Sequence, residues 1–206
     1  MEKINSKIKL HIQFGIFATI WIILLLAGGV TSLLDLVNVA KKFPLAVTVY
    51  SVLALIFTKW AWRWKIFQGW LVKAPNLQGT WRGTIDSTWE NPATNSGTNL
   101  IPAILSIKQT FDNIDCLLFS KESSSYSMSA EINLDQSGNP YLSYNYTNRS
   151  RASVRERSEV HDGAAILRII KSPDRSLEGE YWTSRKSTGE MRFRFESKSI
   201  AEKFTE

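Results

Sequence analysis

The sequence of 206 residues contains very little of the two residue types that hold most protein metal sites. It has one cysteine, Cys116, and two histidines, His11 and His161. A single thiol cannot form an intramolecular disulfide or a cysteine-based zinc site, and two histidines argue against a histidine-rich metal centre. We therefore expect no metal site in this chain.

The motifs of the common enzyme classes are also missing. The chain has no P-loop, no G-x-G-x-x-G fingerprint, no G-x-S-x-G nucleophile elbow and no H-E-x-x-H motif. Glu178 and Glu180 share a face of a predicted strand that points away from Tyr181, so we expect them in solvent. The sequence predicts no catalytic residue and no cofactor, and a binding protein is favoured over an enzyme.

Acidic residues are scarce in the first third of the chain only. Residues 1–74 contain nine Lys or Arg and two Asp or Glu, whereas residues 75–206 contain sixteen and seventeen. A protein that binds a nucleic-acid polymer carries a positive patch on its folded body. The near-neutral second part therefore argues against such a polymer as a partner.

Long uncharged runs are abundant near the N-terminus. Residues 10–34 form a stretch of 25 without Asp, Glu, Lys or Arg, which is long enough as a helix to cross a hydrocarbon core of about 30 Å. The run over residues 43–58 continues into tryptophans and basic residues that suit an interface, so the second span is placed at about 44–64. A signal peptide or a buried hairpin are the alternatives, but a cleaved signal has a shorter apolar run and no second span.

Basic residues on the flanks of these spans predict their orientation. Lys41 and Lys42 lie in the predicted connecting loop, whereas seven basic residues lie on the outer flanks: Lys3, Lys7, Lys9, Lys59, Arg63, Lys65 and Lys73. Because basic flanks stay in the cytoplasm, both termini and the following domain are expected there. Residues 1–74 are thus predicted to be a two-helix transmembrane region.

From Pro75 onward the sequence has the texture of strands and turns. Short β-branched and aromatic runs alternate with Asn, Asp, Gly, Ser and Pro clusters, which predicts eight strands. Their expected ranges are 79–88, 101–110, 114–121, 124–134, 140–148, 163–170, 177–185 and 189–197. Short links favour an antiparallel meander, and eight such strands can close into a barrel over residues 75–198. Residues 199–206 are expected to form a C-terminal tail, with one helical turn over 200–204.

Alternation along the strands sorts their faces. Four stripes are predicted to share one face each: Tyr126, Met128, Ala130, Ile132 and Leu134; Leu142, Tyr144, Tyr146 and Asn148; Leu177, Gly179, Tyr181, Thr183 and Arg185; and Met191, Phe193 and Phe195. The second and third stripes change from apolar residues to Tyr and then to polar or cationic tips. Such an interior suits a small-ligand cavity, although a plain core in which the Tyr hydroxyls find backbone partners remains the alternative.

Two short segments add detail to this barrel. Gly79–Thr80–Trp81 resembles the G-x-W signature of lipocalin-like barrels, which implies that Trp81 plugs the closed end beneath an arginine, here Arg192 or Arg194. The loop after the fifth strand carries four arginines, Arg149, Arg151, Arg155 and Arg157. Arginines can clamp phosphates through paired N–H donors, so Arg149 and Arg151 are a possible phosphate clamp. The alternative is a solvated loop.

Taken together, these features resemble a known family. Two N-terminal spans before a cytoplasmic eight-stranded barrel, with the motifs Tyr144-x-Tyr146-x-Asn148, His161-x-Gly163 and Gly179-x-Tyr181-x-Thr183-x-Arg185, resemble the two-transmembrane β-barrel effectors of bacterial anti-phage CBASS systems. The resemblance implies a barrel that binds a cyclic dinucleotide made by a cognate nucleotidyltransferase. It also implies that the effector oligomerises and that its helices disrupt the bilayer of the inner membrane, which aborts the infection.

The same resemblance implies roles for particular residues. Tyr144, Tyr146 and Tyr181 would stack on the two bases, and Asn148, His161, Thr183 and Arg185 would meet phosphate or ribose. Two alternatives stay open. One is a membrane-anchored lipocalin-like binder of an apolar ligand, in which Met128 or Phe193 would matter. The other is an interaction module with a solid barrel and no nucleotide ligand.

Overall fold

A computed structural model describes residues 6–30, 35–69, 71–88 and 99–205 of the chain. The chain divides into two compact units, Glu2–Leu71 and Val72–Glu206. The first contains the helices and the second contains the strands. Each unit is described by itself below.

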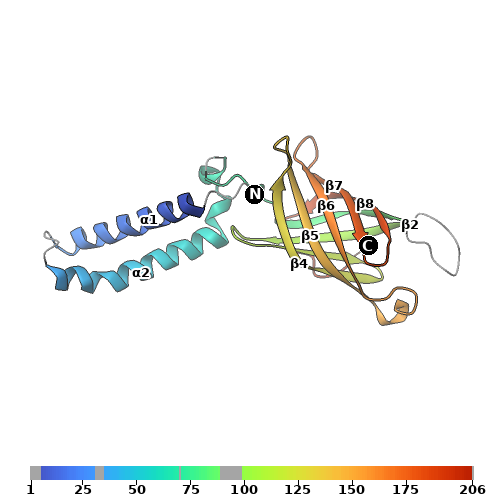
Figure 1. Cartoon of the computed structure of the whole chain (residues 1–206), viewed down its shortest axis with the longest axis horizontal. Coiled ribbons are helices and arrows are strands. Elements are labelled where there is room, and N and C mark those ends of the chain that lie inside the picture. Colours follow the sequence, from blue (N-terminus) through green and yellow to red (C-terminus); the bar gives the residue numbers. More distant parts are fainter. Residues whose placement is uncertain (1–5, 31–34, 70, 89–98, 206) are drawn as a thin grey trace. The chain divides into compact units, whose positions relative to one another are not determined.

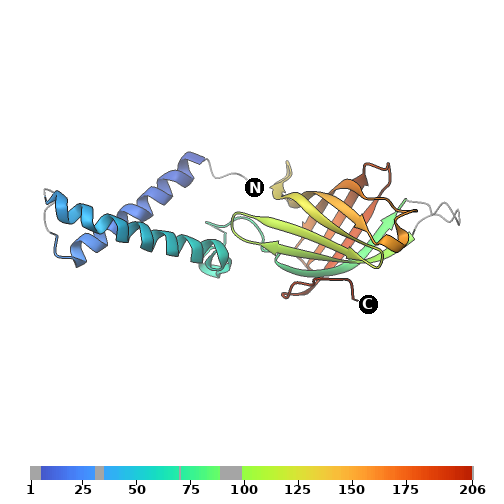
Figure 2. The same ribbon diagram turned by 90° about the horizontal axis from the view of Figure 1, so that it is seen from below.

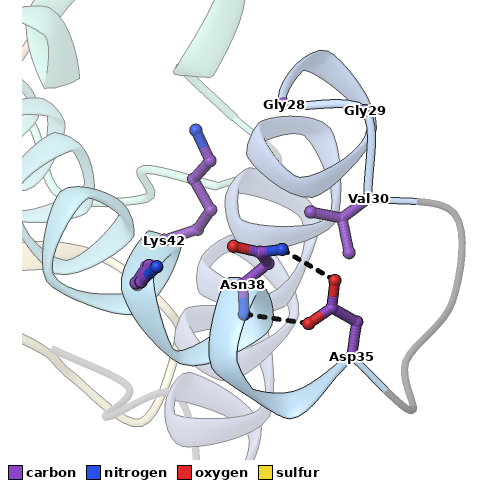
Figure 3. A pocket seen from close by; sticks show the side chains of 7 residues that line it. Gly28, Gly29, Val30, Asp35, Asn38 and Lys42 are labelled. Atoms are coloured by element: carbon purple, nitrogen blue, oxygen red, sulfur yellow. Dashed lines mark hydrogen bonds between the residues drawn. The ribbon is translucent and has the colours of Figure 1, made fainter.

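The N-terminal unit is a pair of helices, α1 (Ser6–Ala27) and α2 (Leu36–Lys59). Phe17 of α1 packs edge-on against Phe43 and Tyr50 of α2, with ring centroids 5.6 and 5.8 Å apart. The side chain of Asp35 caps α2 by accepting hydrogen bonds from the backbone N–H and the side-chain amide of Asn38 (Figure 3). Asp35 and Asn38 also line a polar hollow of about 400 Å³ between the end of α1 and the start of α2.

The helix boundaries differ from the expected ones. The first helix ends at Ala27, before Gly28 and the left-handed Gly29 (φ 72°), and residues 31–34 of the predicted span lie outside the described residues. The second begins earlier, because Asp35 caps it, so that Lys41 and Lys42 lie in the helix and not in a loop. It also ends at Lys59, and two short 3₁₀ turns, Ala61–Arg63 and Lys65–Phe67, replace its predicted end.

Only one described helix has the length and composition of a membrane span. This is α2, whereas the described apolar part of α1, His11–Ala27, is shorter. The prediction of membrane-spanning helices is therefore supported for one helix by length and composition, and the second span stays a prediction.

The C-terminal unit is a closed barrel of eight antiparallel strands in which each strand pairs with the next and β8 pairs with β1 (Figures 1 and 2). The strands are β1 (Gly79–Ser87), β2 (Asn99–Gln109), β3 (Ile114–Ser120), β4 (Ser123–Leu134), β5 (Pro140–Ser150), β6 (His161–Ile170), β7 (Ser176–Thr183) and β8 (Thr188–Ser197). This confirms the predicted eight-stranded antiparallel barrel. The short loops and period-2 alternation that predicted it also explain it, because neighbouring strands of a meander pair directly and alternate residues fill the interior.

One predicted stripe of side chains is wrong. Ala130 and Ile132 of β4 face the core, but Tyr126 and Met128 are 47% and 64% exposed. The register between β4 and β5 shifts between Ser127 and Ser129. Such a bulge inserts one extra residue and exchanges the faces on its two sides. Leu134, at the end of the strand, is also exposed.

Trp81 lies buried at one end of the barrel. Its side chain is 1% exposed, and its indole N–H donates to the carbonyl oxygen of Leu77 over 2.9 Å. The cation over it is Arg175, whose guanidinium lies 5.3 Å from the Trp81 ring and 4.0 Å from the ring of Phe195. Trp81 is thus buried at this end of the barrel, as the plug prediction requires.

The predicted partners of Trp81 were Arg192 and Arg194, and this prediction is wrong. Both arginines are exposed, and Arg192 pairs with Glu190. Alternation on β8 explains their position, because Met191, Phe193 and Phe195 occupy the inner face and leave the outer face to the arginines.

The C-terminal tail lies along the outside of β1 and β2 as an extended segment (Figure 2). The hydroxyls of Thr80 and Ser106 donate to the carbonyl oxygens of Ser199 and Ala201, and the Arg82 guanidinium donates to that of Thr205. These bonds use backbone groups that a helix would need. The predicted helical turn over 200–204 is therefore absent from the described tail.

Candidate ligand-binding site

The end of the barrel opposite Trp81 holds a cavity of about 420 Å³, within the usual range for small-molecule sites. β1, β3, β5 and β7 end here and the even-numbered strands begin here. Its polar and aromatic lining consists of Ser87, Ser120, Lys121, Glu122, Ser123, Ser125, Tyr146, Asn148, Arg157, Ser158, His161, Tyr181, Thr183, Arg185 and Ser187. Apolar side chains, among them Ile85, Leu118 and Met191, line the rest.

Two tyrosines are seated against glycines on neighbouring strands. Tyr146 on β5 is in register with Gly163 on β6, and Tyr181 on β7 is in register with Gly189 on β8. A Cβ atom at Gly163 would lie 2.5 Å from the Tyr146 hydroxyl, and one at Gly189 would lie 2.7 Å from the Tyr181 ring. The missing side chains therefore give both rings room to lie against the backbone. This gives a physical reason for the glycine in the His161-x-Gly163 motif.

Hydrogen bonds fix most of the polar groups around these rings. The Tyr181 hydroxyl donates to the Ser87 hydroxyl over 2.6 Å. The side-chain amide of Asn148 donates to the hydroxyls of Ser123 and Ser125 over 3.0 and 2.9 Å. Both amide hydrogens are then used on the protein, and the side-chain carbonyl oxygen is the group of Asn148 that remains as an acceptor.

Positive charge collects at the mouth of the cavity. Lys121, Arg157 and Arg185 line it with one carboxylate, Glu122, which pairs with Arg157. Arg185 donates from Nη1 to the Ser158 hydroxyl over 3.4 Å, and its buried Nε has no hydrogen-bond partner in the described structure. Burial lowers the pKa of Arg185 below its usual value. A desolvated guanidinium with an unused donor is ready to bind an anion.

His161 begins β6 at the edge of this mouth. Its Nδ1 lies 2.8 Å from the carbonyl oxygen of Glu159, and since that oxygen can only accept, Nδ1 carries the hydrogen. Burial, and next the charge of Arg185, lower the pKa of His161, whereas the Glu159 hydrogen bond and Asp162 raise it. The neutral ring therefore presents Nε2 as an acceptor, which becomes a donor when the ring is protonated.

The structure brings together six of the seven residues that were predicted to bind ligand. Tyr146, Asn148, His161, Tyr181, Thr183 and Arg185 all line the cavity. Tyr144 lies deeper, at 3% exposure, with its hydroxyl 3.8 Å from the sulfur of Met191. Desolvation raises the pKa of both Tyr144 and Tyr146, so both stay neutral. A ligand-binding role for these residues remains a prediction.

The predicted phosphate clamp is not at the cavity. Arg149 and Arg151 are exposed and lie outside its lining, because β5 continues to Ser150 and alternation turns Arg149 outward. From the same loop, Arg157 and Ser158 line the cavity instead. This loop contains a short 3₁₀ turn, Ala152–Val154, that the sequence did not predict.

Five serines on two sides of the cavity were not predicted as site residues. Ser120, Ser123 and Ser125 line one side of the cavity, and Ser87 and Ser187 line the other. The serine-rich run over residues 120–129 was the available signal. Its alternation placed the serines of β4 on the outer face, and the bulge in that strand reverses this for Ser125.

This combination of groups suits an anion that carries flat rings. Tyr rings offer stacking surfaces, cationic side chains neutralise phosphates, and hydroxyl groups and an amide oxygen can bond ribose or base edges. Among the described residues no group of three or more His, Cys, Asp or Glu is placed to hold a metal ion. Cys116 is a buried core thiol, and desolvation, with a smaller contribution from Asp115, raises its pKa.

Comparison with known proteins gives the family of this barrel. Residues 72–194, more than half of the chain, match the family described as "Cap15, cyclic dinucleotide receptor domain". The chain belongs to this Cap15 family. The match spans every residue that lines the cavity. It confirms the resemblance to CBASS effectors that the sequence predicted.

Two relatives extend the similarity beyond the barrel. The chain is 26% identical over 197 residues to CD-NTase-associated protein 15 of Staphylococcus schleiferi, covering 94% of this chain and 97% of that protein. It is also 26% identical over 148 residues to CD-NTase-associated protein 15 of Escherichia albertii, covering 71% and 73%. The first of these Cap15 proteins is therefore similar along nearly the whole chain, helices included.

Proposed function

We propose that this chain is the receptor and effector of a CBASS system, that its open-ended cavity binds a cyclic dinucleotide from a cognate nucleotidyltransferase, and that it is not an enzyme. The observation that carries this is the cavity, in which two tyrosine rings and a desolvated arginine face the same space. A cyclic dinucleotide has two bases for stacking and two phosphates for cationic donors.

The charged and hydrogen-bonding groups of the lining favour this proposal over the two alternatives. An apolar ligand has no use for the guanidinium, hydroxyl and amide groups that line this cavity beside its apolar side chains. Met128, which that alternative invoked, lies outside the barrel. An interaction module with a solid barrel gives no reason for a half-buried arginine whose Nε has no hydrogen-bond partner in the described structure.

The helices are proposed to place the receptor in the bacterial inner membrane. In this arrangement α1 and α2 both span the bilayer, with both termini and the barrel in the cytoplasm, as the basic flanks predict. Ligand binding favours a homo-oligomer, and the gathered helices disrupt the membrane. The ligand drives this step through its higher affinity for the assembled state.

Melting temperatures test the proposal. The full chain in detergent is heated with and without each member of a panel of cyclic di- and trinucleotides. A ligand at 100 times its dissociation constant adds about 2.7 kcal/mol to the free energy of unfolding, so one member should raise the melting temperature selectively. A well-folded chain that no member stabilises would overturn the proposed function. Leakage of a dye from liposomes that contain the protein, with and without the active nucleotide, tests membrane disruption separately.

A further inference from the structure

The outer surface of β6 and β7 carries two large apolar side chains in solvent. Trp182 on β7 is 45% exposed and Ile166 on β6 is 43% exposed. Single exposed apolar residues are common, but these two are neighbours. Ile166 is in register with Glu180, and Trp182, two residues along the same face, is in register with Ala164. We call this pair the Trp182–Ile166 ridge.

A hollow lies on each side of the ridge, and both ridge side chains line both hollows. One, of about 320 Å³, extends over Asn145 and Ala164 on β5 and β6. The other, of about 410 Å³, extends over Glu178 and Arg192 on β7 and β8. A ridge and hollows on one surface are the shape that a self-complementary interface requires, because each copy supplies both halves.

The charges on this surface are self-complementary as well. Arg168 on β6 and Glu178 on β7 are directly opposite in register, and both are exposed. Neither forms an ion pair with another residue in the described part of the chain. Glu180 and Glu190, also in register, add carboxylates that would repel an anionic lipid surface. These charges therefore favour a protein partner with the same arrangement over a membrane.

The register of β6 and β7 suggests how two copies fit. The two copies would be related by a two-fold axis that runs parallel to the strands, midway between β6 and β7. Each β6 residue of one copy then faces a β7 residue of the other copy, namely the one with which it is in register within a single chain. Trp182 of one copy then lies over the small Ala164 of the other, at the hollow there. Arg168 of each copy meets Glu178 of the other.

We propose that the outer face of β6 and β7 is a two-fold docking surface for a second copy of this chain, centred on Trp182 and Ile166. The inference deepens the oligomerisation step of the proposed function and rests on it. It also suggests a route from ligand to assembly, because Tyr181 and Thr183, on either side of Trp182 in β7, line the cavity.

Charge reversal in the full chain tests this surface. Sedimentation velocity in detergent measures assembly with and without the panel nucleotide that raises the melting temperature most. Arg168→Glu or Glu178→Arg places like charges across the proposed interface, and each is expected to weaken self-association at least tenfold. The double variant Arg168→Glu/Glu178→Arg restores opposite charges and is expected to regain assembly.

Trp182→Glu tests the apolar ridge in the same assay. It is expected to abolish assembly. Leu134→Glu makes the same kind of change at an exposed apolar residue away from the ridge, at the C-terminal end of β4, and should assemble like the unaltered chain. Asn145→Cys supplies an independent measurement of assembly, because it places a thiol at the edge of the proposed docking surface. Cys116 is buried, so a thiol-specific cross-linker reacts only with the introduced cysteine. Melting temperatures of all variants without ligand establish that they are folded.

The outcomes separate this surface from the receptor function. Assembly of Trp182→Glu at the level of the unaltered chain, or a double charge reversal that assembles no better than the singles, would overturn the docking surface. An unaltered chain that stays monomeric would do the same. If the nucleotide still stabilises the protein in those cases, the receptor function stands. If no nucleotide stabilises it but assembly depends on Trp182, the receptor function fails and the surface stands.

Discussion

Replacement of Arg185 by alanine is the sharpest test of the cavity. The guanidinium is half-buried at the mouth, its Nε has no partner in the described structure, and Nη1 makes only a long bond to Ser158. In the free protein the side chain is therefore held by few contacts and is costly to desolvate. We expect Arg185→Ala to leave the melting temperature of the free protein unchanged or to raise it slightly.

The effect on ligand binding should be much larger. A hydrogen bond to a charged group contributes about 1.5–3 kcal/mol, and since each 1.4 kcal/mol is tenfold, the affinity should fall roughly 10- to 150-fold. Isothermal titration calorimetry on the full chain in detergent, with the most stabilising panel nucleotide, measures this loss. Arg185→Lys keeps the charge but not the planar fork, so it should recover only part of the affinity.

Arg149→Ala is the matched control for this experiment. It removes the same charge from a nearby exposed position that does not line the cavity. It should change the affinity by less than about threefold at 0.15 M salt, where exposed charges are screened within about 8 Å. Equal losses for the two alanine variants would mean that only net charge matters, and an unchanged affinity for Arg185→Ala would refute the assignment of the site.

Three further predictions concern the cavity and the plug. Because burial lowers the pKa of His161 and an anionic ligand would favour its protonated form, affinity should rise as the pH falls from about 7.5 to 5.5, and His161→Gln should flatten this dependence in calorimetry. For the stability of the free protein the pH dependence is opposite, because the unfolded chain binds the His161 proton more readily than the folded chain. The stability that depends on neutral His161 is present above the ordinary histidine pKa and is lost as the pH falls through the lowered pKa of the folded state. Gly163→Ala should displace the Tyr146 ring, and should therefore lower the free energy of unfolding by about 1–3 kcal/mol in denaturant titrations and weaken nucleotide binding. Full binding together with an unchanged denaturation midpoint would contradict this packing. Arg175→Gln should lower the free energy of unfolding by about 0.5–1 kcal/mol, because the guanidinium loses its contacts with the Trp81 and Phe195 rings. Arg192→Gln, on the outer face, should not lower it. A larger loss for Arg192→Gln than for Arg175→Gln would show that Arg175 is not the cation that packs on Trp81.

Local patterns in the chain were sufficient for the barrel. All eight strands lie within two residues of their expected ranges, because alternation and turn residues act over a few neighbouring positions. The same is true of the stripes on β5, β7 and β8, whose predicted residues keep one face inward, because the register shift between β8 and β1 comes only after Phe195. These stripes carried Tyr146, Tyr181 and Thr183 to the cavity. Local sequence thus determined the fold class and the position of these three site residues.

Tertiary structure decided what local alternation cannot encode. A bulge in β4 turned Met128 outward and brought Ser125 inward, and such a shift depends on how β4 pairs with β5. Closure of the barrel placed Arg175, which precedes β7, over Trp81 at the start of β1. The path of the loop after β5 placed Arg157, and not Arg149, in the lining of the cavity. These contacts join residues far apart in the chain. Their partners are set by strand register and by the closure of the barrel, neither of which is written in any short stretch of sequence.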